Sequence, residues 1–227
     1  SVWAKVPEIP QSPLTVTVAS APKSLDPALA TDAAGARLLQ LTNPALLRLD
    51  DSFNTVGLVA KTCEANTTFT EATCTIPSGR TFHDGTPVTA LEIQGWFSFL
   101  KFSPRSPLAG TLEAVKTISS LDANTLQFTL KQPTLGFLQT LSDIPVAPTP
   151  KDETMGSPRP GLGPYRIGST DTLGTVTLVP TLPGFQPLVV IPLADPTTRL
   201  LKLKRGEVDV VLNDLPPELV EWSKNQG

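Results

Sequence analysis

Cys63 and Cys74 are the residues in this sequence with the clearest chemistry, and they lie eleven positions apart. The segment around them, KTCEANTTFTEATCTI, alternates threonine and apolar residues on both sides of a polar centre, which is typical of a β-hairpin. A turn centred near Thr68 places the cysteines opposite each other, within reach of a disulfide. A disulfide would indicate an oxidising compartment; the alternative is two reduced, unpaired thiols. Zinc is not expected, because two thiols and one distant histidine cannot supply four ligands.

Catalytic chemistry has little support among the remaining residues. His83 is the only histidine, and no serine, cysteine or carboxylate constellation can be argued around it. Asp84, Gly85 and Pro87 predict a turn, since Asp can bond its own backbone, Gly accepts unusual dihedrals and Pro restricts φ. With no nucleophile–base pair and no metal-ligand cluster, we predict neither an enzyme nor a bound metal or cofactor.

Binding residues are expected where a strand leads into a helix. Thr31, Asp32 and Ala33 follow the first predicted strand, and ligands of open α/β lobes sit at the carboxyl ends of strands. The competing interpretation, slightly favoured, is that Thr31 or Asp32 caps the helix that follows. The GLGPY segment has Gly161, Gly163 and Tyr165 but lacks the later glycine and helix of a dinucleotide fingerprint.

Composition excludes several classes of protein. Of 227 residues, 40% are hydrophobic, 17% are charged and 24 are proline, which indicates many short elements separated by rigid turns. The net charge of −3 and the scattered Lys and Arg residues lack the basic stripe of a nucleic-acid-binding protein. A run of about 20 apolar residues, as a membrane span needs, does not occur. The Pro-containing opening, residues 1–13, predicts a tether.

The first half of the chain predicts elements that begin and end at identifiable residues. A strand is expected over 14–20, then a helix with Ala36, Leu39 and Asn43 along one stripe, ended by Pro44. Thr89 and Glu92 form a capping-box pattern, and the helix behind them should bury four apolar residues: Ala90, Ile93, Phe97 and Leu100. A second hairpin is predicted over 115–130, and a short helix over 134–141.

The last third has a different pattern. After a turn-rich segment, APTPKDETMGSPRPG, strands are expected near 164–168 and 173–180. PLVVIPL predicts a buried strand, Asp195 a helix cap and Arg199 a helix-surface residue. Gly206 should stop this helix before the strand VDVVL, so a parallel strand pair is expected. Pro216 and Pro217 open a last helix.

Four segments in order resemble the peptide- and nickel-binding family of extracytoplasmic solute-binding proteins of ABC importers. They are the opening TVASAPKSLDPALATDAAGARLLQLTNPALLRLDDSFN, then FHDGTPVTALEI, GLGPYRI and DPTTRLLKLKRGEVDVV. One departure is Cys63, which occupies a position where the family usually has tryptophan. Another is length, since family members continue for some 250 residues or more, a typical size for a further domain.

The resemblance implies an α/β fold like that of periplasmic binding proteins. We expect a first lobe, a mixed sheet with flanking helices, at 14–43 and 151–227, and a smaller inserted α+β subdomain at 44–150. The second lobe is expected to be missing, through engineered truncation, proteolysis or natural shortening. Implied ligand contacts are Gly161, Gly163 and Tyr165 near the hinge, and Arg105 and Ser106 in a loop of the insert.

The resemblance also implies a function and partners. The expected role is capture of a peptide or similar small solute by lobe closure, weakly in this first-lobe portion, and delivery to the membrane permease of an ABC importer. The expected location is extracytoplasmic, either the periplasm or a membrane-tethered lipoprotein at the cell surface. Self-association through an exposed lobe face is a further expectation. The alternative is a non-transport interaction or sensor module that kept the fold. No nucleic-acid partner is expected.

Overall fold

The structure is a computed structural model that describes residues 12–152, 154–212 and 215–224. It forms two compact units. Unit 1 contains the residues up to Pro22 and from Pro164 onward, and unit 2 contains Lys23–Gly163. Eleven residues of the predicted tether, 1–11, lie outside the described residues.

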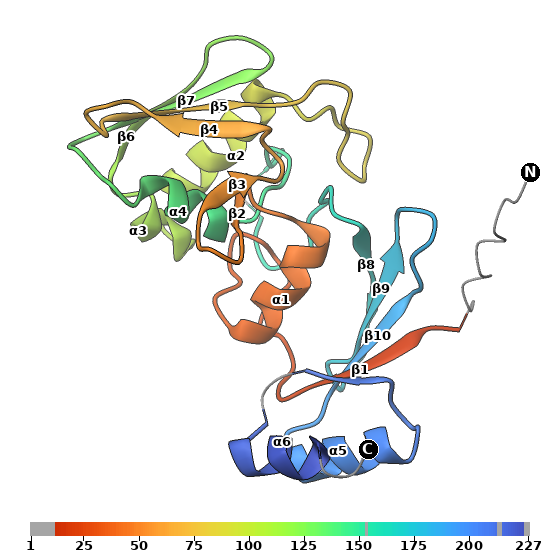
Figure 1. Ribbon diagram of the computed structural model, residues 1–227. Helices are drawn as coiled ribbons and strands as arrows, with labels where there is room; N and C mark the ends of the chain where they lie inside the picture. The colour runs from red at the N-terminus through yellow and green to blue at the C-terminus, as the bar shows by residue number, and fades with distance from the viewer. Residues whose placement is uncertain (1–11, 153, 213–214, 225–227) are drawn as a thin grey trace, which may run out of the picture. The chain divides into compact units, whose positions relative to one another are not determined.

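Unit 1 is built on a mixed five-stranded sheet with the strand order β11-β1-β10-β9-β8 (Figure 1). β1 (Leu14–Val18) pairs in parallel with both β10 (Leu188–Pro192) and β11 (Val210–Val211). β9 (Val176–Pro180) pairs antiparallel with β10 and with β8 (Tyr165–Thr170). The mixed α/β fold class is therefore confirmed.

The expected strand–helix–strand unit is present, with one correction. Helix α5 (Pro196–Lys204) connects β10 to β11, and Asp195 caps it by accepting a hydrogen bond from the Thr198 amide. Gly206, at φ +69°, follows the helix as predicted. The two strands are not neighbours, however, because β1 lies between them. The crossover skips one position, which the amino-terminal strand fills. Helix α6 (Pro217–Lys224) follows.

Two burial predictions in unit 1 are wrong. Arg199 is 1% exposed and lies on the buried face of α5 beside Leu200, because its long aliphatic stem can follow that face inward. In β10 only Val190 is buried, and the other residues of this strand are half-buried. The described elements of unit 1 therefore cover this apolar strand incompletely.

Unit 2 contains an antiparallel four-stranded sheet with the order β4-β5-β7-β6. Its strands are β4 (Thr62–Ala65), β5 (Glu71–Thr75), β6 (Val115–Ser120) and β7 (Thr125–Leu130). A hairpin of β2 (Leu47–Leu49) and β3 (Thr55–Gly57) is separate. The helices are α1 (Ala33–Thr42), α2 (Ala90–Phe102), α3 (Leu108–Thr111) and α4 (Phe137–Asp143). Both predicted hairpins are present.

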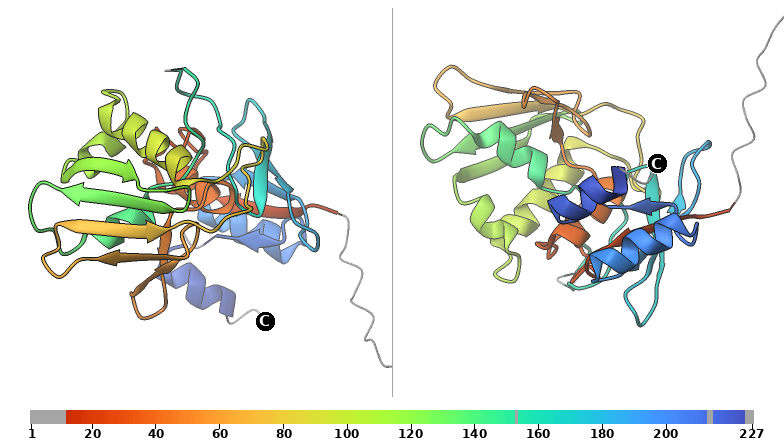
Figure 2. Two further views of the ribbon diagram at one scale, coloured as in Figure 1. Left: turned by 90° about the horizontal axis from the view of Figure 1, so that it is seen from above. Right: turned by 60° about the horizontal axis from the view of Figure 1, so that its bottom comes forward.

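The core of unit 2 lies between α2 and this sheet, and Figure 2 shows α2, in yellow-green, beside the strands. The four residues predicted to face it are completely buried: Ala90, Ile93, Phe97 and Leu100. Phe128 of β7 packs edge-to-face against Phe97 at 5.3 Å and against Phe137 at 5.4 Å between ring centroids. The predicted helix face is confirmed.

Helix α2 begins at its predicted cap, but the capping box is only half formed. The Thr89 hydroxyl accepts a hydrogen bond from the Glu92 amide at 3.1 Å. The Glu92 carboxylate accepts instead from the amide of Thr149, a residue distant in sequence. A tertiary contact thus replaces the reciprocal local bond.

The predicted disulfide is present. Cys63 of β4 and Cys74 of β5 are paired directly opposite each other and are bonded, with no free cysteine. The side chain of Cys74 is completely buried. The hairpin assignment and its register are confirmed together.

Helix α1 also begins and ends where the sequence predicts, before Pro44, but its buried face differs. Leu39 and Asn43 are buried as expected, whereas Ala36 is exposed. Ala34 and Leu38 are buried instead, so the buried face is rotated by part of a turn.

The predicted domain limits at 43/44 and 150/151 differ from the compact units, which divide at 22/23 and 163/164. The difference arises because residues on both sides of the predicted limits bond to one another. Asp26 bonds Arg159 and the Gly156 amide, and Asn43 bonds the carbonyls of Val146 and Pro160. Residues 23–43 and 151–163 therefore belong to the same compact unit as the predicted insert.

Candidate functional site

The segment Thr31–Ala33 opens helix α1, and Asp32 is its cap. Asp32 accepts hydrogen bonds from the amides of Gly35 at 2.9 Å and Lys23 at 3.1 Å, using one carboxylate oxygen for each. Thr31 and Ala33 are exposed. Of the two interpretations offered by the sequence, helix capping thus describes Asp32, and the flanking side chains face solvent.

The loop with Arg105 and Ser106 packs against the turn that precedes α1. The buried Ser106 hydroxyl donates to the Ala28 carbonyl at 2.8 Å and accepts from the Leu108 amide. Arg105 is exposed. The structure therefore brings the insert loop and the segment leading into Thr31 together, with Ser106 as the structural link.

A buried carboxylate that the sequence did not single out organises this region. Asp26, completely buried, accepts from the Ala28 amide at 3.0 Å, Arg159 Nε at 3.1 Å and the Gly156 amide at 2.7 Å. The Arg159 guanidinium also lies 5.7 Å from the Trp96 ring centroid and 5.3 Å from that of Phe99. The loop around residues 154–160 is thereby fixed to the start of unit 2.

The glycines of GLGPY pack against the opposite end of α1. A Cβ on Gly161 would lie 1.8 Å from the Thr42 carbonyl oxygen, and one on Gly163 would lie 2.1 Å from that of Leu41. Only glycine permits this approach of two backbones. Since α1 has ten residues, about 15 Å of helix separates these glycines from Thr31.

His83 bonds the same glycine loop. Its Nε2 lies 2.9 Å from the Gly163 carbonyl oxygen, and its Nδ1 accepts from the Gly161 amide at 3.3 Å. Its backbone amide donates to the Gly161 carbonyl at 2.7 Å. With the proton on Nε2 and Nδ1 as acceptor, the ring satisfies both of its contacts, and the backbone amide makes the third, so this histidine has a structural role.

Tyr165 belongs to unit 1, where it opens strand β8. It is buried, its hydroxyl donates to the Gln186 carbonyl at 2.9 Å, and its ring packs edge-on against Phe185. Burial raises the pKa of this hydroxyl above its ordinary value, so it stays protonated.

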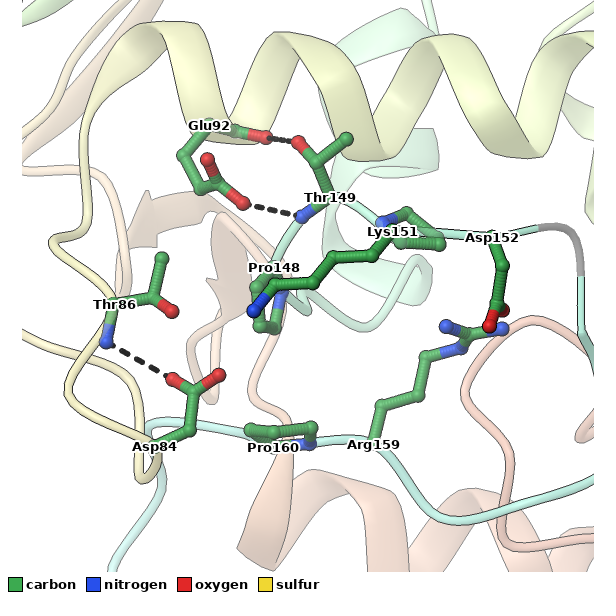
Figure 3. A pocket seen from close by; sticks show the side chains of 10 residues that line it. Asp84, Thr86, Glu92, Pro148, Thr149, Lys151, Asp152, Arg159 and Pro160 are labelled. Atoms are coloured by element: carbon green, nitrogen blue, oxygen red, sulfur yellow. Dashed lines mark hydrogen bonds between the residues drawn. The ribbon is translucent and has the colours of Figure 1, made fainter.

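A pocket of about 570 Å³ lies in unit 2, between the start of α2 and the proline-rich loops (Figure 3). None of the predicted ligand-binding residues lines it. Its walls carry three carboxylates, two cations, three prolines and two threonines, and the full lining is Asp84, Thr86, Glu92, Pro148, Thr149, Pro150, Lys151, Asp152, Arg159 and Pro160. The sequence did contain an indication of this pocket. The segment APTPKDETMGSPRPG, interpreted only as turn-rich, also carries three charged residues that line it: Lys151, Asp152 and Arg159.

Two contacts fix the loop wall against α2. Thr149 donates its amide to the Glu92 carboxylate and its hydroxyl to the Glu92 carbonyl at 2.9 Å. Gly95 leaves room for this contact, since a Cβ there would lie 2.1 Å from the Thr149 hydroxyl oxygen. These contacts hold the loop that carries Thr149 against the first turns of α2, so this wall of the pocket is fixed.

The carboxylates at this pocket are not arranged as a metal site. Among the described residues, no group of three or more His, Cys, Asp or Glu side chains lies close enough to hold a metal ion. Hydrogen bonds from Thr154 lower the pKa of Asp152, so this carboxyl is ionised at neutral pH. The pocket therefore offers fixed charges and hydrogen-bonding groups to a ligand.

Solved structures with this fold are solute-binding proteins. OppA from Burkholderia pseudomallei has a TM-score of 0.81 at 19% identity, covering 96% of this chain and 49% of that one. The oligopeptide-binding protein AppA from Bacillus subtilis, in complex with a nonapeptide, has a TM-score of 0.78 at 18% identity, covering 87% and 43%. NikZ from Campylobacter jejuni, in complex with Ni(L-His), has a TM-score of 0.76 at 21% identity, covering 88% and 43%. These three likenesses show that the chain has the fold of such proteins.

Residues 27–227 match the family model described as "Bacterial extracellular solute-binding proteins, family 5 Middle". The chain therefore belongs to family 5 of the bacterial extracellular solute-binding proteins. A curated relative, the probable D,D-dipeptide-binding periplasmic protein DdpA of Escherichia coli (strain K12), is 28% identical over 244 residues, 96% of this chain. The chain spans 46% of that relative's length. No helix in the described part of the chain is long and apolar enough to cross a membrane.

Proposed function

We propose that this chain supplies one lobe of the substrate-binding component of an ABC importer. The observation that carries the proposal is the family match over residues 27–227. The mechanism is capture: a cleft closes on the solute and replaces its water shell with backbone and polar contacts. In this assignment residues 14–43 and 151–227 form the core of the lobe, and residues 44–150 form the inserted subdomain. Binding and release without covalent chemistry distinguish this role from an enzyme's.

The proposed solute is a peptide or a molecule of similar size. Support comes from the relative described as dipeptide-binding and from the shared fold with a protein that holds a nonapeptide. Exposed Thr31, Ala33 and Arg105 are the proposed direct contacts, with Asp32 and Ser106 holding their loops. Gly161, Gly163 and Tyr165 are proposed to shape the hinge side of the cleft.

We further propose a membrane permease as partner and a location outside the cytoplasm, either in the periplasm or as a membrane-tethered lipoprotein at the cell surface. The disulfide supports an oxidising compartment. Self-association is proposed through apolar side chains exposed on unit 1: Leu173, Leu182, Phe185, Leu201, Leu203 and Trp222. Sedimentation velocity over a range of protein concentrations tests this last proposal.

The test of solute capture uses the complete product of the encoding gene, unfolded and refolded to remove co-purified ligand. Calorimetry against dipeptides, longer peptides and a nickel–histidine complex should find one class that binds with micromolar or tighter affinity. Substitution of Arg105 by alanine should weaken that binding. If every class fails to bind the refolded protein, solute capture is the wrong function.

A further inference from the structure

The pocket beside α2 has walls that are fixed before any ligand arrives. Pro148, Pro150 and Pro160 have restricted φ angles, and the buried Asn43 amide donates to the carbonyls of Val146 and Pro160, both at 3.1 Å. These bonds join the two loops that supply the prolines. A preformed pocket loses little conformational entropy on binding.

Three charged groups of the pocket keep hydrogen-bonding or ion-pairing capacity that the described residues do not use. Asp84 uses Oδ1 to accept from the Thr86 amide at 3.0 Å, and Glu92 uses Oε1 to accept from the Thr149 amide. The second oxygen of each carboxylate accepts no hydrogen bond from the described residues. Lys151 forms no ion pair within the described part of the chain, and in Figure 3 its side chain extends across the pocket toward Asp84 and Glu92.

The second cation of the pocket is not equally available. Arg159 pairs through Nε with the buried Asp26 and also donates to the Thr154 carbonyl. Lys151 is therefore the cation that remains for a ligand among the described lining residues, and it shares the pocket with two carboxylates that each retain an acceptor.

This arrangement selects a class of ligand. A simple anion would meet three carboxylates, and a simple cation would meet Lys151 and Arg159. A sugar would find no aromatic ring among the described residues that line the pocket. A ligand with an ammonium at one end and a carboxylate at the other matches both signs at once. The volume of about 570 Å³ suits a ligand the size of an amino acid or dipeptide.

We propose that this pocket binds a small zwitterion, with its ammonium at Asp84 and Glu92 and its carboxylate at Lys151. The pocket lies wholly within residues 84–160 of unit 2 and therefore needs no second lobe. The inference goes beyond the proposed function, since lobe closure can succeed or fail independently of it.

The test titrates the isotope-labelled 227-residue chain with L-alanyl-L-alanine and follows backbone amide resonances. Saturable shifts are expected at Thr86, Thr149 and Lys151, with Thr177 of unit 1 unchanged. N-acetyl-dialanine lacks the ammonium and dialanine amide lacks the carboxylate, so each should bind about tenfold more weakly, the loss of one charge-assisted contact. Absence of localised shifts at about 50 mM dialanine, well above a millimolar dissociation constant, would overturn the proposal.

Substitutions that remove a charge but nearly preserve the side-chain shape test whether the charges of the pocket determine its affinity for the dipeptide. Asp84→Asn and Glu92→Gln keep the oxygen that accepts the local amide, and Lys151→Gln removes the cation, so each variant should fold and bind about tenfold more weakly. The matched control is Asp171→Asn, whose carboxylate makes the same kind of bonds, to the Leu173 and Thr175 amides, outside the pocket. Unchanged affinity in all three pocket variants, or equal binding of the capped dipeptides, also overturns the proposal.

Discussion

At the scale of single residues, the buried ion pair of Asp26 and Arg159 connects segments 133 positions apart. The Asp26 side chain is completely buried and that of Arg159 is 14% exposed. A buried pair of this kind adds little net stability over apolar residues, but removing one partner leaves the other charge without compensation. The geometry around residues 154–160 therefore depends on both members.

Arg159→Met should lower the free energy of unfolding by about 3 kcal/mol, because it keeps the contact with Trp96 and Phe99 but leaves the Asp26 carboxylate without its cation. Urea denaturation measures the change. Combining it with Asp26→Asn should restore part of the loss. The exposed Arg105→Met serves as control and should change stability by less than about 0.5 kcal/mol. Equal effects of the two arginine substitutions would contradict this account.

The Cys63–Cys74 disulfide permits a chemical prediction. Thiol titration of the unfolded, unreduced protein should detect no free thiol, and reduction should lower the free energy of unfolding by about 2–3 kcal/mol, since the closed loop is short. A Cys63→Ala/Cys74→Ala double variant should be insensitive to reductant. Two titratable thiols before reduction would disprove the bond.

At the scale of elements, helix α2 connects the sheet of unit 2 to the pocket. Its buried face packs on β6 and β7, and its first turn presents Glu92 to the proline-rich loop. The same helix therefore has a core side and a binding side, and substitutions on each should have separable effects.

Phe97→Ala should cost about 3–5 kcal/mol of stability, because the completely buried ring also contacts Phe128. Thr89→Ala removes the capping oxygen and should cost about 1 kcal/mol. Leu91→Ala, at a side chain that is 65% exposed, is the control and should be nearly neutral. Thermal or urea denaturation gives all three values, and a similar small loss in each would argue against the assigned buried face.

Gly161→Ala should destabilise unit 2 by about 2–3 kcal/mol, because the new Cβ would collide with the carbonyl of Thr42 and separate the loop from α1. Gly110→Ala is the matched control, since a Cβ there meets nothing within 4 Å. Equilibrium denaturation compares the variants. Tolerance of alanine at Gly161 would show that the close approach to α1 is not required.

At the scale of the whole molecule, the chain covers just under half of the relatives it matches. Small-molecule sites typically bury about 70–90% of the ligand surface, and the proposed capture needs two lobes to do so. The affinity of this chain by itself is therefore a direct test of that requirement.

The 227-residue chain should fold cooperatively but bind peptides with a dissociation constant no tighter than about 1 mM, since an incompletely enclosed ligand keeps much of its water. Calorimetry against a mixed peptide library, with sedimentation to establish the oligomeric state, checks this. A one-to-one micromolar complex with monomeric protein would show that one lobe is sufficient and would refute the closure requirement.

The sequence by itself determined the elements whose signals are local. Thr89, Asp195 and Gly206 mark helix ends, and the paired cysteines set the register of their hairpin, because caps, turns and facing positions act over a few residues. The four short motifs that resemble the family were enough to predict the α/β fold class that the structure confirms.

Only the tertiary structure decided which distant segments meet. It inserted β1 between β10 and β11, buried Arg199, paired Asp26 with Arg159, and directed Glu92 to Thr149 rather than to its own cap. Each outcome depends on competition among partners far apart in the chain, which local propensity and periodicity do not encode. The charged pocket formed in this way, because its walls become neighbours only when the proline-rich loops pack against α2.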